Sequence, residues 1–167
     1  RFLNKIFSYL IFFLFFYNIT LSSQLKCNFQ EVYQDGQIQN GILFLGSNQI
    51  RYQYNDEKLF TLIYHNNEIL YSVSNQNSSE LAQINHNKEI FKTILDIKDN
   101  NNISETLHLD GMQVDIEKNK KDKFVKRLAI KSKDLNMSIF FIDCVEKEID
   151  KKLFYVNPFY EYSGNDF

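Results

Sequence analysis

The stretch GILFLGSNQIRYQY, residues 41–54, predicts two short β-strands joined by a tight turn. Five of its apolar residues fall at alternate positions on the two sides of the turn, at Leu43, Leu45, Ile50, Tyr52 and Tyr54. Because successive side chains of a strand point to opposite faces, all five can lie on one face. The turn itself, 46–48, is Gly-Ser-Asn, which are turn-forming residues. The shared face belongs either to an ordinary core or to a cavity that holds an apolar ligand.

The rest of the chain continues this two-residue period with frequent polar or turn-like breaks. The expected strands are 26–34, 40–46, 49–55, 58–65, 68–74, 81–86, 105–109, 111–118, 123–132 and 136–145. Many short strands separated by turns indicate an antiparallel sheet that curls into a sandwich or barrel. One helix is expected over 88–97, where Ile90, Phe91, Ile94 and Leu95 form an apolar stripe.

The strand 136–145 is apolar on both faces. Its residues Met137, Ile139 and Phe141 should face one way. Phe140, Ile142 and Cys144 should face the other way. A strand of this kind is expected to be covered on both sides. One face would pack on a helix or a second sheet, while the other would line an interior.

The N-terminal residues 1–23 have the pattern of a secretory signal peptide. Arg1 and Lys5 precede the apolar run 6–17, which is followed by small residues up to Ser23. The alternative is an uncleaved membrane anchor, although the run is shorter than the roughly 20 residues needed to span a bilayer. Cleavage near Ser22 or Ser23 would leave a domain over 24–160 and a tail over 161–167.

The chain has two cysteines, Cys27 and Cys144. Export would place them in an oxidising compartment, where one disulfide can form. The two residues lie in the first and last expected strands, which often meet in a rolled sheet. The other possibility, two buried thiols in the core, stays open at this point.

Composition gives no sign of catalytic chemistry. The net charge is −2, whereas a nucleic-acid-binding domain would be strongly basic. The three histidines show no metal-ligand spacing, and no nucleophile elbow or glycine-rich phosphate loop is present. The locally basic run 117–127 reads as a solvated hairpin or as a contact for an acidic partner or a lipid headgroup. We therefore expect a non-enzymatic protein with no metal and no cofactor.

The order of motifs along residues 25–160 resembles the LolA family of periplasmic lipoprotein carriers. The similar positions are Gln30, Gly41, Leu43, Leu45, Ile50, Arg51, Tyr52 and Tyr54, then Ile63-Tyr64 and Ile69-Leu70-Tyr71. The segment 90–95 lies where the family has a lid helix, and 150–158 is similar to the family's closing segment. The resemblance implies a mainly β fold with a helical lid, an incomplete antiparallel β-barrel of the LolA/LolB kind over an apolar cavity.

The resemblance also implies a function and a set of contacts. Such a carrier binds the acyl chains of lipoproteins and shuttles them across the periplasm, from an inner-membrane releasing transporter to an outer-membrane receptor. It acts as a monomer and does not bind nucleic acid. The residues expected to line the lipid cavity are Leu43, Leu45, Ile50, Tyr52, Tyr54, Leu62, Phe91, Ile94, Leu95, Phe140 and Ile142. Ile50 also matches a family position near the mouth, where partners dock.

Two features depart from the family. The turn 46–48 lacks the family's basic residue followed by proline, which helps to hold the lid helices. Only a few residues separate the expected cleavage site from the first strand, where the family has an amphipathic helix. The alternatives are a LolA-like protein that senses lipids or lipoproteins, and a membrane-anchored interaction protein without carrier activity.

Overall fold

The computed structural model describes residues 24–65, 69–77, 80–84, 88–100, 103–109, 111–118 and 123–156. The expected signal peptide, 1–23, and the expected tail, 161–167, lie outside this part of the chain. Ten strands form one antiparallel sheet in the order β6-β5-β4-β3-β2-β1-β10-β9-β8-β7. Within the described residues neither β6 nor β7 has a second neighbour, so the sheet is open.

Every strand expected from the sequence is present within a few residues of its expected bounds. The strands are β1 (Leu25–Tyr33), β2 (Ile38–Leu45), β3 (Gln49–Tyr54), β4 (Phe60–His65), β5 (Ile69–Ser74), β6 (Leu81–Ile84), β7 (Thr106–Leu109), β8 (Met112–Glu117), β9 (Arg127–Lys131) and β10 (Asn136–Glu146). The helix α2 (Lys88–Asp99) and a short 3₁₀ turn, η1 (Lys151–Phe154), complete the described elements. The prediction of a mainly β, antiparallel fold with one helix is confirmed.

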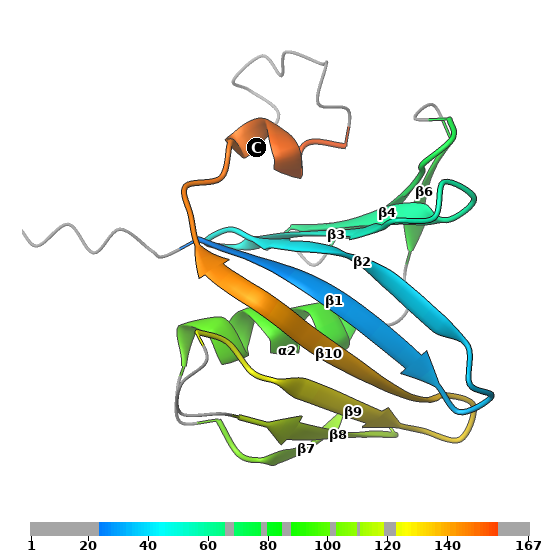
Figure 1. The fold of residues 1–167 in the computed structure, drawn as a ribbon, viewed down its shortest axis with the longest axis vertical. Coiled ribbons are helices and arrows are strands. Elements are labelled where there is room, and N and C mark those ends of the chain that lie inside the picture. Colours follow the sequence, from blue (N-terminus) through cyan, green and yellow to red (C-terminus); the bar gives the residue numbers. More distant parts are fainter. Residues whose placement is uncertain are drawn as a thin grey trace, which may run out of the picture.

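The helix α2 lies behind β1 and β10, between the β3–β6 side and the β7–β9 side of the bent sheet (Figure 1). We call the face of the sheet toward α2 the inner face. Its residues alternate along β2 and β3 as the sequence predicts, with Leu43 and Leu45 of β2 and Tyr52 of β3 all buried. On α2, Phe91, Ile94 and Leu95 are also buried, so the apolar stripe faces the sheet.

The pairing of β1 with β10 joins two meanders into a single sheet. The strands β1 to β6 follow one another on one side, and β10 back to β7 follow on the other. A disulfide between Cys27 and Cys144 links the two central strands across a sequence separation of 117. Of the two possibilities left open by the sequence, the structure has the disulfide.

A β-bulge brings Cys144 to the inner face. The register between β1 and β10 shifts between Lys26 and Asn28, and Asp143 has a φ of 52°. A bulge inserts an extra residue and so exchanges the faces of the residues that follow it. Strict alternation would place Cys144 with Phe140 and Ile142 on the outer face, as expected from the sequence. That expectation is wrong, because the bulge turns Cys144 toward Cys27.

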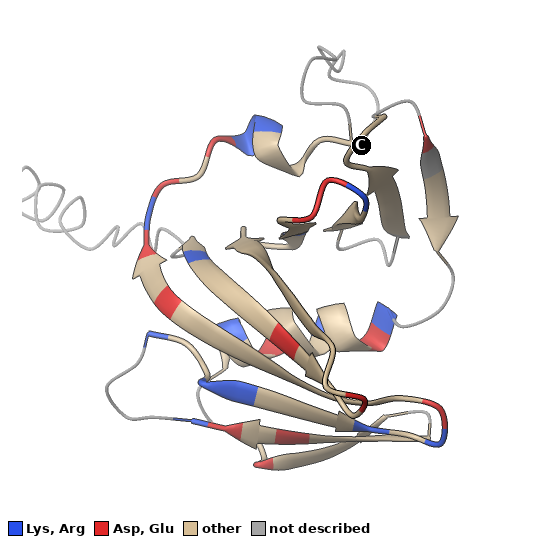
Figure 2. Ribbon diagram, turned by 45° about the vertical axis from the view of Figure 1, so that its right-hand side comes forward, with Lys and Arg blue, Asp and Glu red and all other residues tan. Residues whose placement is uncertain are grey.

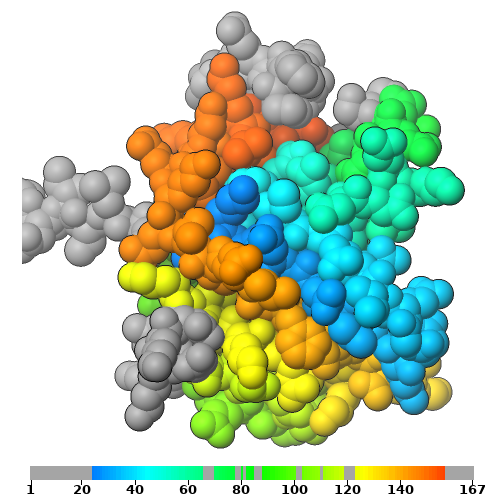
Figure 3. Space-filling model, viewed as in Figure 1, coloured from blue at the N-terminus to red at the C-terminus, as the bar shows by residue number. Residues whose placement is uncertain are grey.

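The outer face carries a smaller packed region near the end of the described chain. Arg51, which alternates with the inward-facing Ile50 and Tyr52, donates a hydrogen bond from Nη1 to the Leu153 carbonyl oxygen at 3.1 Å. The ring of Phe154 is 1% exposed and lies against Gly46. The remaining outer surface over β2, β1 and β10 is open to solvent (Figure 3).

The disulfide should contribute substantially to stability, because it closes a loop of more than one hundred residues. Replacing both Cys27 and Cys144 with Ala should lower the free energy of unfolding by about 2–5 kcal/mol. Urea denaturation followed by circular dichroism measures this. Reductant should lower the urea concentration at the unfolding midpoint of the unaltered protein but should not change that of the double variant. An equal response of the two proteins would contradict the prediction.

Gly41 of β2 has no room for a side chain. A Cβ atom there would collide with the Phe29 ring on β1 and with the Gln53 carbonyl oxygen on β3. Gly41→Ala should therefore cost about 1–3 kcal/mol of stability, the usual range for overpacking a core. Thermal unfolding tests this, and the additional change Phe29→Leu should recover part of the loss. An alanine variant as stable as the unaltered protein would contradict the close packing.

Candidate ligand-binding site

A pocket of about 240 Å³ lies between the inner face of the sheet and α2. Most of its lining is apolar or aromatic. The lining residues are Glu31, Tyr33, Tyr52, Tyr54, Phe60, Leu62, Leu70, Ile84, Ile90, Phe91, Ile94, Ile130, Leu135, Met137 and Ile139. Glu31, Tyr52 and Ile94 are buried, whereas Tyr33 and Ile90 are half-buried and Phe60 is exposed, so the pocket has a closed floor and an accessible rim.

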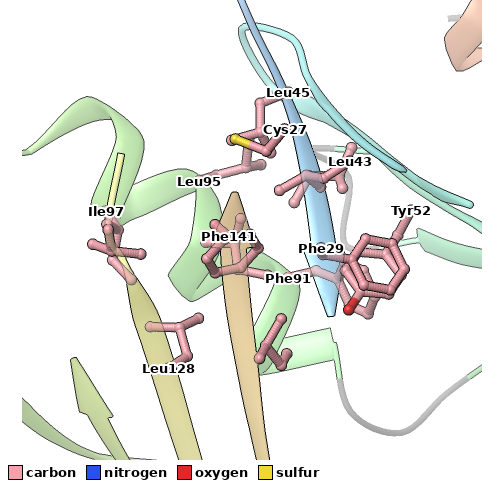
Figure 4. Close-up of a cluster of buried hydrophobic side chains, with 14 of the residues drawn as sticks. Cys27, Phe29, Leu43, Leu45, Tyr52, Phe91, Leu95, Ile97, Leu128 and Phe141 are labelled. Carbon is pink, nitrogen blue, oxygen red and sulfur yellow. The ribbon is translucent and has the colours of Figure 1, made fainter. Parts of the chain in front are cut away.

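Aromatic rings hold the helix over this pocket. Phe91 of α2 meets Tyr52 edge to face at a centroid distance of 5.9 Å and stacks with Tyr64 at 6.1 Å. Tyr52 in turn stacks on Phe29 at 3.8 Å. Figure 4 shows the Phe29 and Tyr52 rings overlapping, with Phe91 of the helix close to them. Offset-stacked and edge-to-face pairs of this kind add to the stabilisation from burial.

The glycine at position 41 allows this aromatic group to assemble. Phe29, Gly41 and Tyr54 are cross-strand neighbours on β1, β2 and β3. Because the middle residue has no side chain, the Phe29 and Tyr54 rings approach to 5.5 Å across β2. The same gap lets Tyr54 extend over β2 toward Glu31 on β1.

Glu31 is the unusual residue of the pocket, since it is a carboxylate that is only 3% exposed. Three phenol groups donate hydrogen bonds to it. Tyr33 donates to Oε2 and Tyr52 to Oε1, each at 2.7 Å, and Tyr54 is 3.0 Å from both oxygens. Burying a charge costs free energy unless the charged group is hydrogen-bonded, and the three phenols provide these hydrogen bonds. None of the lining residues is Lys, Arg or His, so the charge has no cation in the pocket.

Burial and the neighbouring carboxylate both raise the pKa of the three phenols. Burial raises the pKa of Tyr52 and of Tyr54, and the negative charge of Glu31 raises both further. The pKa of Tyr33 is also raised, by burial and by its hydrogen bond to Glu31. All three therefore stay protonated as donors well beyond neutral pH.

The structure brings together some of the expected cavity residues and separates others. Tyr52, Tyr54, Leu62, Phe91 and Ile94 line the pocket. Leu43, Leu45, Ile50 and Leu95 belong to the adjoining buried core cluster but are not part of the lining. Ile50 is also fully buried, so its side chain does not offer a surface for a docking partner.

The expectation that Phe140 and Ile142 line the cavity is wrong. Their neighbours Ile139 and Phe141 are buried on the inner face, so the intervening side chains point outward. Ile142 is 45% exposed. The guanidinium carbon of Arg127 lies over the Phe140 ring, 5.9 Å from the centroid of that ring. Up to the bulge at Asp143, alternation along β10 permits only one of the two apolar sets to face α2.

Glu31 is not among the site residues predicted from the sequence, although a signal for it is present. Leu25, Cys27 and Phe29 precede it at alternate positions and are all buried, so Glu31 occupies the next inward position. A carboxylate at a core position requires nearby donors. The tyrosines at 33, 52 and 54 share its face and could have been matched to it.

Opposite charges are paired on and beside β8 and β9. Salt bridges join Glu117 to Lys126 and Arg127, and Asp115 to Lys131. Figure 2 shows acidic and basic residues next to one another on these strands. In the described part of the basic run 117–127, Lys126 and Arg127 thus pair with a local carboxylate, whereas Lys118 donates to the Ile103 carbonyl oxygen.

Two kinds of feature are absent from the residues that the structure describes. Within them, no three residues among His, Cys, Asp and Glu are grouped so that they could bind a metal ion. In the same part of the chain, no helix has the length and apolar character needed to cross a membrane.

Comparison with known proteins gives little family information. A family model described as "third domain" matches residues 57–113, about a third of the chain. No curated protein sequence matches the chain. The solved structure titled "Structure of PNGF-II in C2 space group" is similar over 81% of this chain, with 12% identity and a TM-score of 0.41. The chain covers only 30% of that protein, and a similarity at this level says nothing about function.

The buried phenols predict a loss of stability at alkaline pH. Tyrosines of the unfolded chain release protons near their ordinary pKa of 10.0, whereas the folded pKa of Tyr52 is higher. The folded state therefore holds more protons above pH 10, and the free energy of unfolding should fall as pH rises beyond it. Below that pH the effect should be absent.

Each proton that the folded state keeps and the unfolded chain releases should change the slope of the free energy of unfolding against pH by about 1.4 kcal/mol per pH unit. Tyr52→Phe should make the alkaline fall correspondingly shallower in urea denaturation measured at several pH values. Tyr71→Phe, on the outer face, is the matched control and should retain the slope. Equal slopes for the Tyr52 variant and the unaltered protein would contradict the assignment.

Proposed function

We propose that this chain is a periplasmic carrier of the LolA kind, which binds the acyl chains of lipoproteins under α2 and carries them between membranes. The observation that supports this most directly is the apolar pocket between the helix and the inner face of an open antiparallel sheet. The proposal identifies this sheet with the incomplete barrel of that family, and α2 with its lid helix. Binding and release of acyl chains require no covalent step, so the proposed role is not enzymatic.

The pocket is small for this ligand as the structure stands. Its volume of about 240 Å³ is below the range of about 300–1,000 Å³ that is typical of ligand sites. A complete acyl chain therefore requires α2 to move away from the strands. Aromatic side chains such as Phe91 make contacts between α2 and the strands, and Ile90 at the rim is only half-buried. Reversible displacement of the helix is what a carrier needs, because it must release its cargo.

The disulfide supports the compartment in the proposal. Disulfides form and persist in oxidising environments such as the bacterial periplasm and are rare in reducing ones. Cys27 and Cys144 are bonded in this structure. The proposed partners are those that the resemblance implies, an inner-membrane transporter that releases lipoproteins and an outer-membrane receptor that accepts them.

A charge at the rim of the pocket should block cargo binding without disrupting the core. Ile90→Glu places a carboxylate at a half-buried lining position of α2, where it opposes the entry of an acyl chain. The full chain, co-expressed in the periplasm with an acylated outer-membrane lipoprotein, should give a one-to-one adduct in native mass spectrometry. We expect Ile90→Glu to lose at least about 90% of this adduct, because burying an unpaired charge is costly.

Ile38→Glu is the matched control. Ile38 is 55% exposed and lies away from the pocket, so its variant should retain the adduct. Failure of the folded, unaltered protein to bind any acylated protein would contradict the carrier role. An adduct with free lipid alone would instead favour a lipid-binding or lipid-sensing protein.

A further inference from the structure

The hydrogen-bonded group of Glu31, Tyr33, Tyr52 and Tyr54 is not explained by storage of an acyl chain. An all-hydrocarbon ligand needs only an apolar lining. A charged group at a core position imposes a desolvation cost that an apolar residue of similar size would avoid. Glu31 nevertheless lies among the lining residues of the pocket, 3% exposed.

The acceptor capacity of the carboxylate is already used by the phenols. Oε2 accepts a hydrogen bond from Tyr33 and Oε1 accepts one from Tyr52, while the hydroxyl of Tyr54 is shared between the two oxygens. Each phenol oxygen can still accept a hydrogen bond while it donates its own proton. Donation to a negative charge also polarises the phenol and strengthens it as an acceptor. Tyr33 is half-buried at the rim, so its oxygen is placed where a ligand group can reach it.

The sign of the charge restricts which ligand group fits here. The lining of the pocket contains a carboxylate and no cationic side chain. A second carboxylate brought into this low-dielectric site would be repelled. A hydroxyl or amide N–H group would instead find a strong acceptor.

We infer that the Glu31–tyrosine group selects acyl ligands that carry an uncharged hydrogen-bond donor beside the chain, such as the free hydroxyl of a glycerol monoester or the N–H of an N-acyl amide, and rejects free fatty-acid anions. This inference rests on the proposed function, because it assumes that acyl chains enter the pocket. It adds that the pocket distinguishes a lipid-modified or glyceride headgroup from the free acid of the same chain length. Specificity then comes mainly from a repulsive element that acts against the wrong ligand.

The test compares dodecanoate with its glycerol monoester at neutral pH, using the full chain. Each ligand displaces a neutral fluorescent acyl probe, and the dissociation constants are compared. The monoester should bind at least about tenfold more tightly than the acid anion, since like charges in a desolvated site cost more than the loss of one hydrogen bond. Glu31→Gln keeps the size of the side chain and should bring the two constants within about threefold.

Glu105→Gln is the matched control, because Glu105 is exposed and does not line the pocket. It should retain the full preference. If Glu31→Gln does not fold, Tyr33→Phe replaces it, since Tyr33 is only half-buried. That variant should weaken binding of the monoester while leaving the binding of the acid anion unchanged.

Equal binding of the two ligands by the unaltered protein would overturn the inference. So would a Glu31→Gln variant that folds and retains the preference, because the group would then serve only to stabilise the core. If neither ligand displaces the probe but the lipoprotein adduct forms, only the selectivity is overturned. If the adduct is absent as well, the carrier role fails with it.

Discussion

The pairing of β1 with β10 is the constraint on which the rest of the structure depends. It joins strands from opposite ends of the described chain and turns two separate meanders into one sheet. Pairing two strands that are this distant in sequence costs chain entropy. The Cys27–Cys144 disulfide reduces this cost, because it restricts the unfolded chain. The bulge at Asp143 allows the covalent link, because it turns Cys144 to the face that Cys27 occupies.

The helix α2, which lies between the two meanders in the sequence, packs on the inner face of the joined sheet (Figure 1). The helix α2 follows β6 at one edge of the sheet and precedes β7 at the other. Its buried residues, including Phe91 and Ile94, then cover the central strands. This arrangement leaves an apolar pocket under the helix whose size depends on how closely the helix approaches the strands. The joining of the two meanders into one open sheet and the position of the candidate site are thus consequences of the same topology.

The candidate site combines two opposing requirements. Its apolar lining favours a hydrocarbon chain, whereas Glu31 brings a charge that the same environment disfavours. Three phenols reconcile them, since each presents an apolar ring to the core and a hydroxyl group to the carboxylate. The glycine at 41 makes the geometry possible by leaving space between Phe29 and Tyr54. A single small residue therefore sets the position of the polar group in the pocket.

Local patterning determined the strands, the helix and most inward-facing positions, because alternation and helical periodicity are properties of neighbouring residues. Leu43, Tyr52 and Phe91 were assigned to the interior on that basis alone. Only the tertiary structure decided that Cys144 faces inward, because a bulge overrides alternation, and that Phe140 and Ile142 lie outside. It also decided that Glu31 meets Tyr52 and Tyr54, from a strand two places away in the sheet. That contact depends on register and on the gap over Gly41, which no local pattern in the sequence specifies.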